Sequence, residues 1–368
     1  MPLALRIAQL VSSRQRRGAE VFASDLSEAL AALGHEVSFA GLAAPPVEPL
    51  APEVTNVDLT SGPLASMSLE IVRSTARHIR ETRPDVIQAN GGAVMKYVAL
   101  AQAWGRTRVP VVYCNIGLSS DWVRHRAQRA WTGWLLRRAD VTAAVSAASR
   151  DDLLRQYGLD PAVVRVVRRG VDVGARVRAD EGRRALTEAG VPSGSFVVLH
   201  VGSFSEEKNH AGLIRIVERV RAESDRDVRL VLVGGGPLYE AVERSAPAHV
   251  HILGIREDVP ALMAGADVLL LPSRTEGIPG VVLEAAAQGI PTVAYDVGGV
   301  SEAVRDGETG AVIEAGDEAA ASGAVLRLIR EPMTLAEWGE AARAFVRDEY
   351  SLDASVHAFL DLYREITR

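Results

Sequence analysis

The sequence predicts an α/β fold with two doubly wound parallel sheets, each in its own domain. Apolar strand-like runs alternate with amphipathic helical segments along the chain, which is typical of parallel sheets covered on both faces. The chain has 368 residues, more than one hydrophobic core usually organises. Residues 1–172 carry 21 basic and 16 acidic side chains, and residues 173–368 carry 20 and 31. This asymmetry indicates two domains with different ligands.

The strands of the first half are expected where short apolar runs occur. Between the first two runs, apolar residues at helical spacing predict a helix over Ala19–Leu33, and Gly34 ends it. The predicted strands are Leu3–Val11, Glu36–Ala40, Val86–Ala89, Val109–Tyr113 and Val141–Val145.

The second half repeats this plan. A helix is expected from about Ala211, and apolar residues at helical spacing predict a final helix within Ser351–Arg368. The charged, glycine-containing segment 173–190 separates the two series and is predicted to be a linker. The predicted strands are Phe196–Val201, Arg229–Val233, Val250–Leu253, Ala266–Leu271 and Thr292–Tyr295.

Bulk composition indicates a globular protein, and the cysteine count fits a reducing compartment. Hydrophobic residues make up 48% of the chain and charged residues 24%. The single cysteine, Cys114, excludes an intrachain disulfide. The N-terminus lacks the basic start and cleavage site of a signal peptide, and no apolar run reaches the ~18 residues of a membrane span. We therefore expect a cytoplasmic protein, at most peripheral to the inner face of the membrane.

The segment from Arg274 to Pro291 places two carboxylates, Glu276 and Glu284, on either side of a Gly/Pro-rich bend. A buried strand precedes the bend and a short helix follows it. Free backbone N–H groups at such a bend form an anion site. Carboxylates beside it would repel a bare phosphate, but they suit a ligand with hydroxyls on both sides of its phosphates. A nucleotide-sugar has that layout.

This segment resembles the signature of the retaining glycosyltransferases of family four, E-G-x-x-x-x-x-x-E-A-x-A-x-G-x-P. The positions that match the signature are Glu276, Gly277, Glu284, Ala285, Ala287, Gly289 and Pro291. The resemblance extends over about a hundred residues, through Gly234-Gly-Gly-Pro237, Gly254-Ile-Arg-Glu-Asp258, Gly298-Gly299, Glu302 and Asp306-Gly307.

The resemblance implies the GT-B fold, with two Rossmann-like domains facing a cleft and a final helix that crosses back onto the first domain. The expected domains are residues 1–172 with 351–368 on the acceptor side, and residues 191–350 on the donor side. It also implies metal-independent, retaining transfer of a hexosyl-type sugar from a UDP- or GDP-linked donor, with no cofactor. The acceptor would be a carbohydrate or lipid-linked hydroxyl in polysaccharide, glycolipid or glycoconjugate synthesis.

The same resemblance implies which residues bind each part of the donor. Glu284 would bind the ribose hydroxyls and Glu276 those of the transferred sugar, while Arg256 would lie near the base. The bend beside the sugar and phosphates would consist of Gly277, Ile278, Pro279 and Gly280.

A second phosphate element follows the strand Phe196–Val201. In the family this loop reads G-R-x-x-x-x-K, and its Arg and Lys hold the diphosphate; here Lys208 fits, whereas Ser203 replaces the Arg. Only two of the 41 basic residues are lysines, so a lysine at 208 indicates a need for a compact point charge. The alternative is a solvated surface lysine. Arg274, or Arg16 and Arg17, would be substitutes for the missing guanidinium.

Two first-half elements resemble family positions more weakly. Gly18 matches the second glycine of the family's G-G-A-E turn, which closes over the diphosphate, while Arg17 replaces the first. Asn90, Gly91 and Asn115 fall where many members carry cleft histidines. We assign these three to the acceptor cleft, with plain turn chemistry as the alternative.

The segment 121–138 contains three of the five tryptophans and five arginines. We expect the tryptophans to be core and the arginines to be their solvated face. The alternative is a peripheral contact with an anionic membrane, which would suit a lipid-linked acceptor.

Other catalytic classes lack their signatures. There is no G-x-G-x-x-G after the first strand, no Walker loop, no zinc-spaced Cys/His cluster and no nucleophile elbow. No nucleic-acid partner is expected. Two alternatives remain: a same-fold enzyme that epimerises or hydrolyses the nucleotide-sugar, and a non-catalytic subunit that binds it.

Overall fold

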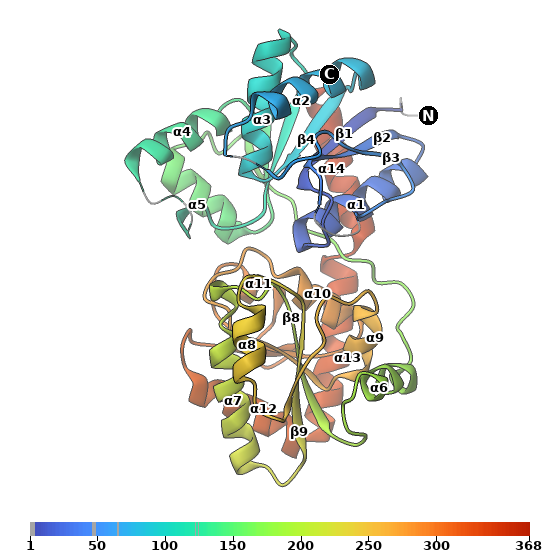
Figure 1. The fold of residues 1–368 in the computed structure, drawn as a ribbon, viewed down its shortest axis with the longest axis vertical. Helices are drawn as coiled ribbons and strands as arrows, with labels where there is room; N and C mark the ends of the chain where they lie inside the picture. The colour runs from blue at the N-terminus through green and yellow to red at the C-terminus, as the bar shows by residue number, and fades with distance from the viewer. Residues whose placement is uncertain (1–3, 46–48, 65, 122, 124) are drawn as a thin grey trace. The chain divides into compact units, whose positions relative to one another are not determined.

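The chain forms two compact units, each built on one parallel sheet (Figure 1). They comprise Met1–Gly170 with Leu352–Arg368, and Val171–Ser351. This computed structural model describes residues 4–45, 49–64, 66–121, 123 and 125–368, with the backbone only at 121. Among these residues no helix has the length and apolar character needed to cross a membrane. The unit boundaries lie close to the predicted positions 172 and 351.

The first unit contains a seven-stranded parallel sheet in the order β3-β2-β1-β4-β5-β6-β7. The strand order reverses between β1 and β4, which pair from Ile7↔Val86 onward. The crevice at the carboxyl ends of these two strands is the position where such sheets bind ligands. The strands are β1 (Arg6–Ser13), β2 (Glu36–Ala43), β3 (Thr55–Asp58), β4 (Val86–Asn90), β5 (Val111–Asn115), β6 (Val141–Ala144) and β7 (Val164–Val166).

Helices cover both faces of this sheet. The largest apolar cluster of the unit joins α2 and α3 to the strands, and a smaller one lies under α1. Glycine or serine precedes several of these helices; Ser68, for example, caps α2 by accepting from the Ile71 amide. The helices are α1 (Gly18–Ala32), α2 (Leu69–Thr82), α3 (Gly92–Gly105), α4 (Arg126–Leu136), α5 (Ala147–Tyr157) and α14 (Leu352–Ile366), with a 3₁₀ turn at Ser119–Asp121.

The final helix α14 belongs to the first unit, as the resemblance implied. Its Phe359 ring packs 6.0 Å from that of Phe22 on α1. Its buried Tyr363 hydroxyl donates to the Gln88 side chain and accepts from Gln9 Nε2 at 3.1 Å. Because buried polar groups need partners, this hydrogen-bonded network fixes α14 against β1 and β4.

The second unit contains a six-stranded parallel sheet in the order β10-β9-β8-β11-β12-β13. Its order reverses between β8 and β11, so the carboxyl ends of these strands form the second candidate crevice. The strands are β8 (Phe196–Val201), β9 (Val228–Val233), β10 (Val250–Ile252), β11 (Val268–Leu271), β12 (Thr292–Tyr295) and β13 (Gly310–Ile313).

Two helical layers cover this sheet as well. Figure 1 shows α7, α8 and α12 on one side and α6, α9 and α13 on the other. The helices are α6 (Ala179–Glu188), α7 (His210–Glu223), α8 (Tyr239–Ser245), α9 (Val259–Gly265), α10 (Gly280–Ala287), α11 (Val300–Ala303), α12 (Glu318–Arg330) and α13 (Pro332–Glu349), with a 3₁₀ turn at Glu206–Lys208.

The segment 173–190 differs from the predicted linker because it contains α6. A Cβ on Gly182 of α6 would lie 2.3 Å from the Gly265 nitrogen of α9, so the two helices approach as closely as only glycine permits. This contact packs the segment into the second unit.

Candidate active site

The predicted lysine and the first predicted glutamate meet at the switch point of the second unit. Lys208 ends the 3₁₀ turn after β8, and Glu276 lies in the loop after β11. Lys208 Nζ lies 2.5 Å from Glu276 Oε1. Only 19% of the lysine side chain and 9% of the glutamate side chain are exposed. A pair so shielded from water interacts more strongly than a surface ion pair, so the two side chains hold each other in the crevice.

The two loops are also joined through their backbones. The Arg274 amide donates to the Glu207 carbonyl at 2.7 Å, and Asn209 Nδ2 donates to the Pro272 carbonyl at 3.1 Å. Asn209 has φ +54 and caps α7 by accepting from the Gly212 amide. Asparagine tolerates this left-handed conformation better than most residues. Lys208 is therefore placed by the turn that starts α7.

A third loop, which contains Gly298 and Gly299, packs against the backbone of Glu276. A Cβ on Gly298 would lie 1.8 Å from the Glu276 carbonyl oxygen, and Gly298 has φ +59. The Gly299 amide donates to the Gly277 carbonyl at 2.8 Å. The sequence pattern marked Gly298-Gly299 as part of the resemblance but gave no role for it. The structure assigns the pair to close backbone packing under Glu276 and Gly277.

The bend after Glu276 opens the short helix α10. Ile278, Pro279 and Gly280 are buried, with Pro279 at the N-cap. Proline supplies no side-chain cap; the Val282 amide donates to the Pro279 carbonyl at 3.0 Å, which leaves the amides of Gly280 and Val281 as donors for an anion. Glu284 lies one turn further along the same helix and is half-buried. Glu276 and Glu284 thus flank the bend, as the spacing predicted.

The loop that carries Ser203 is held by a run of glycines. The Gly202 amide donates to the Val233 carbonyl at 2.9 Å, and the Phe204 amide donates to the Gly235 carbonyl at 3.0 Å. A Cβ on Gly234 would lie 2.0 Å from the Gly202 carbonyl oxygen. Ser203 itself is exposed between these anchors. The close packing at these glycines therefore fixes the backbone of Ser203, the position where the family has its arginine.

The side chains of two predicted donor-site arginines have other neighbours than Lys208 and Glu276. Arg256 is held by Asp258 through contacts of 2.8 and 2.6 Å. Arg274 lines a pocket of about 350 Å³ that also includes Arg215 and Tyr295. Neither Lys208 nor Glu276 lines that pocket. This placement gives no support to Arg274 as the substitute for the missing guanidinium at 203.

Two buried histidines lie behind the Lys208 loop. His200 on β8 and His210 at the start of α7 have ring centroids 5.3 Å apart, and His210 stacks on Phe204 at 4.3 Å. Burial lowers the pKa of His200 to about 3 and that of His210 to about 4. The loop therefore rests on neutral imidazoles at physiological pH.

In the first unit, the predicted turn residue Gly18 begins α1 and is exposed. Arg17 is the N-cap and makes no side-chain cap. A Cβ on Gly18 would lie 3.0 Å from Arg169 Nη1. Arg169, which replaces the family's Asn, therefore occupies the space beside this glycine.

The predicted acceptor-cleft residues Asn90 and Asn115 form hydrogen bonds within the first unit. Asn90 Nδ2 donates to the Gln9 side chain at 3.1 Å and to the Leu10 carbonyl at 3.0 Å. Asn115 Nδ2 donates to the Gly117 carbonyl at 2.8 Å. Gly91, with φ +96, is the N-cap of α3. The two amides are committed to internal hydrogen bonds, which favours the turn-chemistry interpretation over an acceptor contact.

Comparison with known proteins decides the family. Residues 16–175 match the family model described as Glycosyltransferase Family 4, and residues 195–331 match the model described as Glycosyl transferases group 1. The chain is 34% identical over 270 residues to alpha-maltose-1-phosphate synthase of Mycolicibacterium smegmatis, covering 67% of each chain. The chain belongs to glycosyltransferase family 4. This glycosyltransferase is also 29% identical over 389 residues to D-inositol 3-phosphate glycosyltransferase 2 of Catenulispora acidiphila, covering 94% of this chain and 89% of the relative.

A solved structure shares the fold of the glycosyltransferase over nearly its whole length. HepE of Anabaena, crystallised with UDP-glucose, superposes with a TM-score of 0.84 at 21% identity, covering 98% of this chain and all of HepE. The two parallel sheets and this likeness establish the GT-B fold. A glycosyltransferase is consistent with an ammonium–carboxylate pair at the switch point of the second sheet and a second carboxylate on the helix that follows.

Proposed function

We propose that this glycosyltransferase moves a hexosyl-type sugar from a UDP- or GDP-linked donor to an acceptor hydroxyl, with retention of configuration and without a metal. The observation that carries the proposal is the shielded Lys208–Glu276 pair beside the amides of α10. Transfer develops negative charge on the leaving diphosphate. A fixed cation and backbone N–H donors stabilise that charge most where water is excluded.

In this mechanism donor binding breaks the Lys208–Glu276 ion pair, and each side chain binds a part of the donor instead. The diphosphate attracts Lys208 Nζ, and Glu276 is released to accept hydrogen bonds from the hydroxyls of the transferred sugar. Glu284, on the far side of the bend, binds the ribose hydroxyls. The acceptor hydroxyl attacks from the face that the diphosphate leaves, and a phosphate oxygen takes its proton. The acceptor belongs to polysaccharide, glycolipid or glycoconjugate synthesis.

UDP-glucose is the first donor to test, because HepE was crystallised with it. The decisive variant is Glu276→Ala, assayed with a panel of UDP- and GDP-sugars by mass analysis of products, with and without acceptors. We expect turnover to fall by at least about a hundredfold, while binding of the nucleoside diphosphate survives. Wild-type activity should persist in a chelator.

The same assay separates the alternatives. A nucleotide-sugar epimerase or hydrolase would change the donor when no acceptor is present. A non-catalytic subunit would bind the donor and transfer nothing to any acceptor. Unchanged turnover in Glu276→Ala would contradict the role given to this carboxylate.

A further inference from the structure

The second unit contains a pocket that the assignment of the donor site does not use. Its wall is formed by the loops after β11 and β13 and by the start of α7. Its volume of about 350 Å³ lies at the lower end of the range for small-molecule sites, about 300–1,000 Å³. One water molecule takes up only about 30 Å³. The pocket is therefore large enough for one small organic molecule.

Two hydroxyl groups in the wall of this pocket have no partner within the described part of the chain. Ser273 is fully buried and Tyr295 is 3% exposed. Neither Ser273 Oγ nor the Tyr295 hydroxyl forms a hydrogen bond with a described residue. An unpaired buried hydroxyl is destabilising, and most such groups in proteins are satisfied. The wall therefore holds two hydrogen-bonding groups that the protein itself does not use.

The Tyr295 hydroxyl is a neutral donor. Burial raises the pKa of Tyr295, and the nearby carboxylates of Glu318 and Asp317 raise it further. These carboxylates have partners of their own, since Glu318 binds Arg215 and Asp317 caps α12 by accepting from the Ala320 amide at 2.8 Å. The phenol therefore keeps its proton at neutral pH and can donate it to a ligand oxygen.

Two guanidinium groups line the same pocket. Arg215 binds Glu318 through Nε at 3.0 Å and through Nη2 at 2.5 Å. Arg274 is exposed and forms no ion pair with a residue that the structure describes. These two cations and the one carboxylate give the lining a net charge of +1. Because a guanidinium binds phosphate or carboxylate oxygens in a bidentate manner, the pocket favours a ligand with one anionic group.

The pocket adjoins the candidate active site without containing its charged pair. Asn209 lines the pocket and follows Lys208 in the chain, while Arg274 precedes Glu276 by two residues. Neither Lys208 nor Glu276 lines it. A ligand here would contact the two loops that carry the pair, and it would leave the place of the donor diphosphate free.

We infer that this pocket binds a small polyhydroxylated compound with one anionic group, a chemistry that sugar phosphates and sugar acids share. Arg274 and Arg215 hold the anion, and Ser273 and Tyr295 form hydrogen bonds with ligand hydroxyls. Both of these oxygen atoms are shielded from solvent, so the contacts need the side-chain rotations that commonly accompany binding. The inference does not depend on the proposed reaction, because it concerns binding alone.

The test is titration calorimetry of the full-length protein with three probes. Glucose 6-phosphate and glucuronate each combine hydroxyls with an anion, whereas glucose has the hydroxyls alone. We expect at least one of the two anionic probes to bind, and their ratio shows whether phosphate or carboxylate is preferred. Glucose should bind at least about tenfold more weakly than the better anionic probe.

Three variants assign the binding to this pocket. Arg274→Gln should weaken binding of the better probe by at least about tenfold, because it removes a charged hydrogen bond. Tyr295→Phe and Ser273→Ala should each weaken it by roughly threefold to tenfold. Since these two hydroxyls have no partner among the described residues, both variants should unfold without the probe at the same urea concentration as the wild type, or at a higher one.

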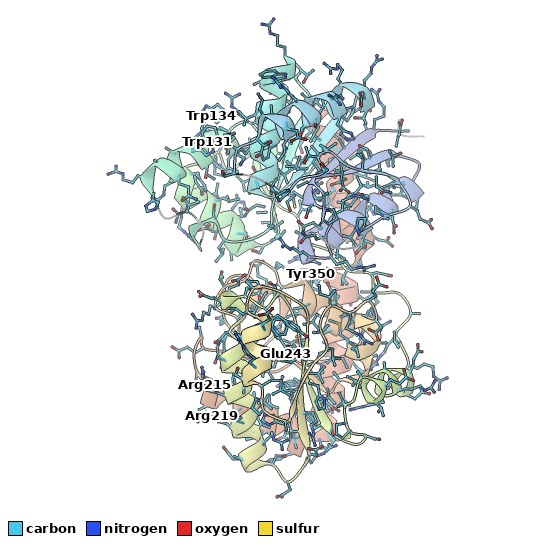
Figure 2. The ribbon with its side chains drawn as sticks, in the orientation of Figure 1. Trp131, Trp134, Arg215, Arg219, Glu243 and Tyr350 are labelled. Atoms are coloured by element: carbon cyan, nitrogen blue, oxygen red, sulfur yellow. The ribbon has the colours of Figure 1, made fainter. Side chains whose placement is uncertain are left out.

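Two control variants separate the pocket from its surroundings. Arg219 is exposed one turn further along α7 and does not line the pocket, and Figure 2 shows it on the same helix as Arg215. Arg219→Gln removes the same charge as Arg274→Gln. Lys208→Met removes the ammonium that we assign to the donor diphosphate. Both controls should bind the probe like the wild type.

Three results would overturn the inference. The first is no binding of either anionic probe at millimolar concentration, which would mean that the pocket holds water only. The second is equal binding of glucose. The third is a loss in Lys208→Met that matches the loss in Arg274→Gln, which would place the probe in the donor site. The comparison of the three probes with the wild type stays decisive even when a variant fails to fold.

Discussion

Gly298→Ala is the substitution whose effect follows most directly from the geometry of the site. The glycine has φ +59, and an added Cβ would lie 1.8 Å from the Glu276 carbonyl oxygen. The left-handed conformation alone costs alanine about 1 kcal/mol. Relieving the contact requires the two backbones to separate by more than about 1 Å, because atoms of this kind pack no closer than roughly 3 Å. Such overpacking adds about 1–3 kcal/mol.

The separation would move the backbone of Glu276, and with it the carboxylate that holds Lys208 at 2.5 Å. A displacement of about 1 Å in a positioned group lowers turnover by roughly a hundredfold. We therefore expect Gly298→Ala to lose about 2–4 kcal/mol in denaturant unfolding, and to lose most of its transfer activity at temperatures where it remains folded.

Gly307→Ala is the matched control. Gly307 has φ +73 and no atom within 4 Å of an added Cβ. This variant should lose only the backbone contribution of about 1 kcal/mol and keep its activity. If Gly298→Ala had the stability and turnover of Gly307→Ala, the packing of this loop under Glu276 would not position the site.

Further predictions concern the lysine, the buried histidines and the final helix. Lys208→Met should reduce transfer by at least about a hundredfold, measured with saturating donor; full activity would mean that the ammonium does not meet the diphosphate. Stability should fall from pH 7 to pH 5 by about 2 kcal/mol for each of His200 and His210, because the unfolded chain takes up protons near pH 6.5 while the folded chain resists them. Urea titrations of the wild type and of His210→Leu measure this, and equal slopes would contradict it. Tyr363→Phe should lose about 2 kcal/mol or more in urea unfolding, because it removes the hydroxyl that Gln9 Nε2 and Gln88 Oε1 share in a buried network; an unchanged midpoint would show that the hydroxyl is dispensable.

The parts of the fold predicted from sequence are those whose pattern is local. Buried parallel strands such as Phe196–Val201 are continuous apolar runs, and the structure places β8 over the same residues. Short strands without such runs escaped detection. Strand β3 alternates exposed and half-buried residues, and β7 has only three residues. Edge strands of this kind are defined by pairing with a neighbour, which sequence alone does not show.

The candidate site residues were predicted where a motif fixed both residue type and spacing, and their roles stay predictions. Lys208 and Glu276 are 68 positions apart in the chain, yet both follow strands at the switch point, and the structure joins them. The support under Glu276 was not predictable, because a glycine reveals freedom at its own position but not the backbone it touches. The prediction of core tryptophans in helix α4 was wrong for a related reason, since Trp131 and Trp134 are exposed; the third tryptophan of that stretch, at position 122, lies outside the described residues. Tryptophans and leucines at mixed spacing do not show which face is inward, and the structure turns Leu135 and Leu136 to the core.

A structure of the full-length protein with a bound, non-hydrolysable nucleotide-sugar is the most direct measurement of the donor site. The diphosphate should lie within hydrogen-bond distance of Lys208 Nζ and of the amides that begin α10. Glu276 should then contact sugar hydroxyls in place of the lysine, and Glu284 should contact the ribose. A ligand bound elsewhere in the chain, or an intact Lys208–Glu276 contact with the ligand present, would contradict this assignment.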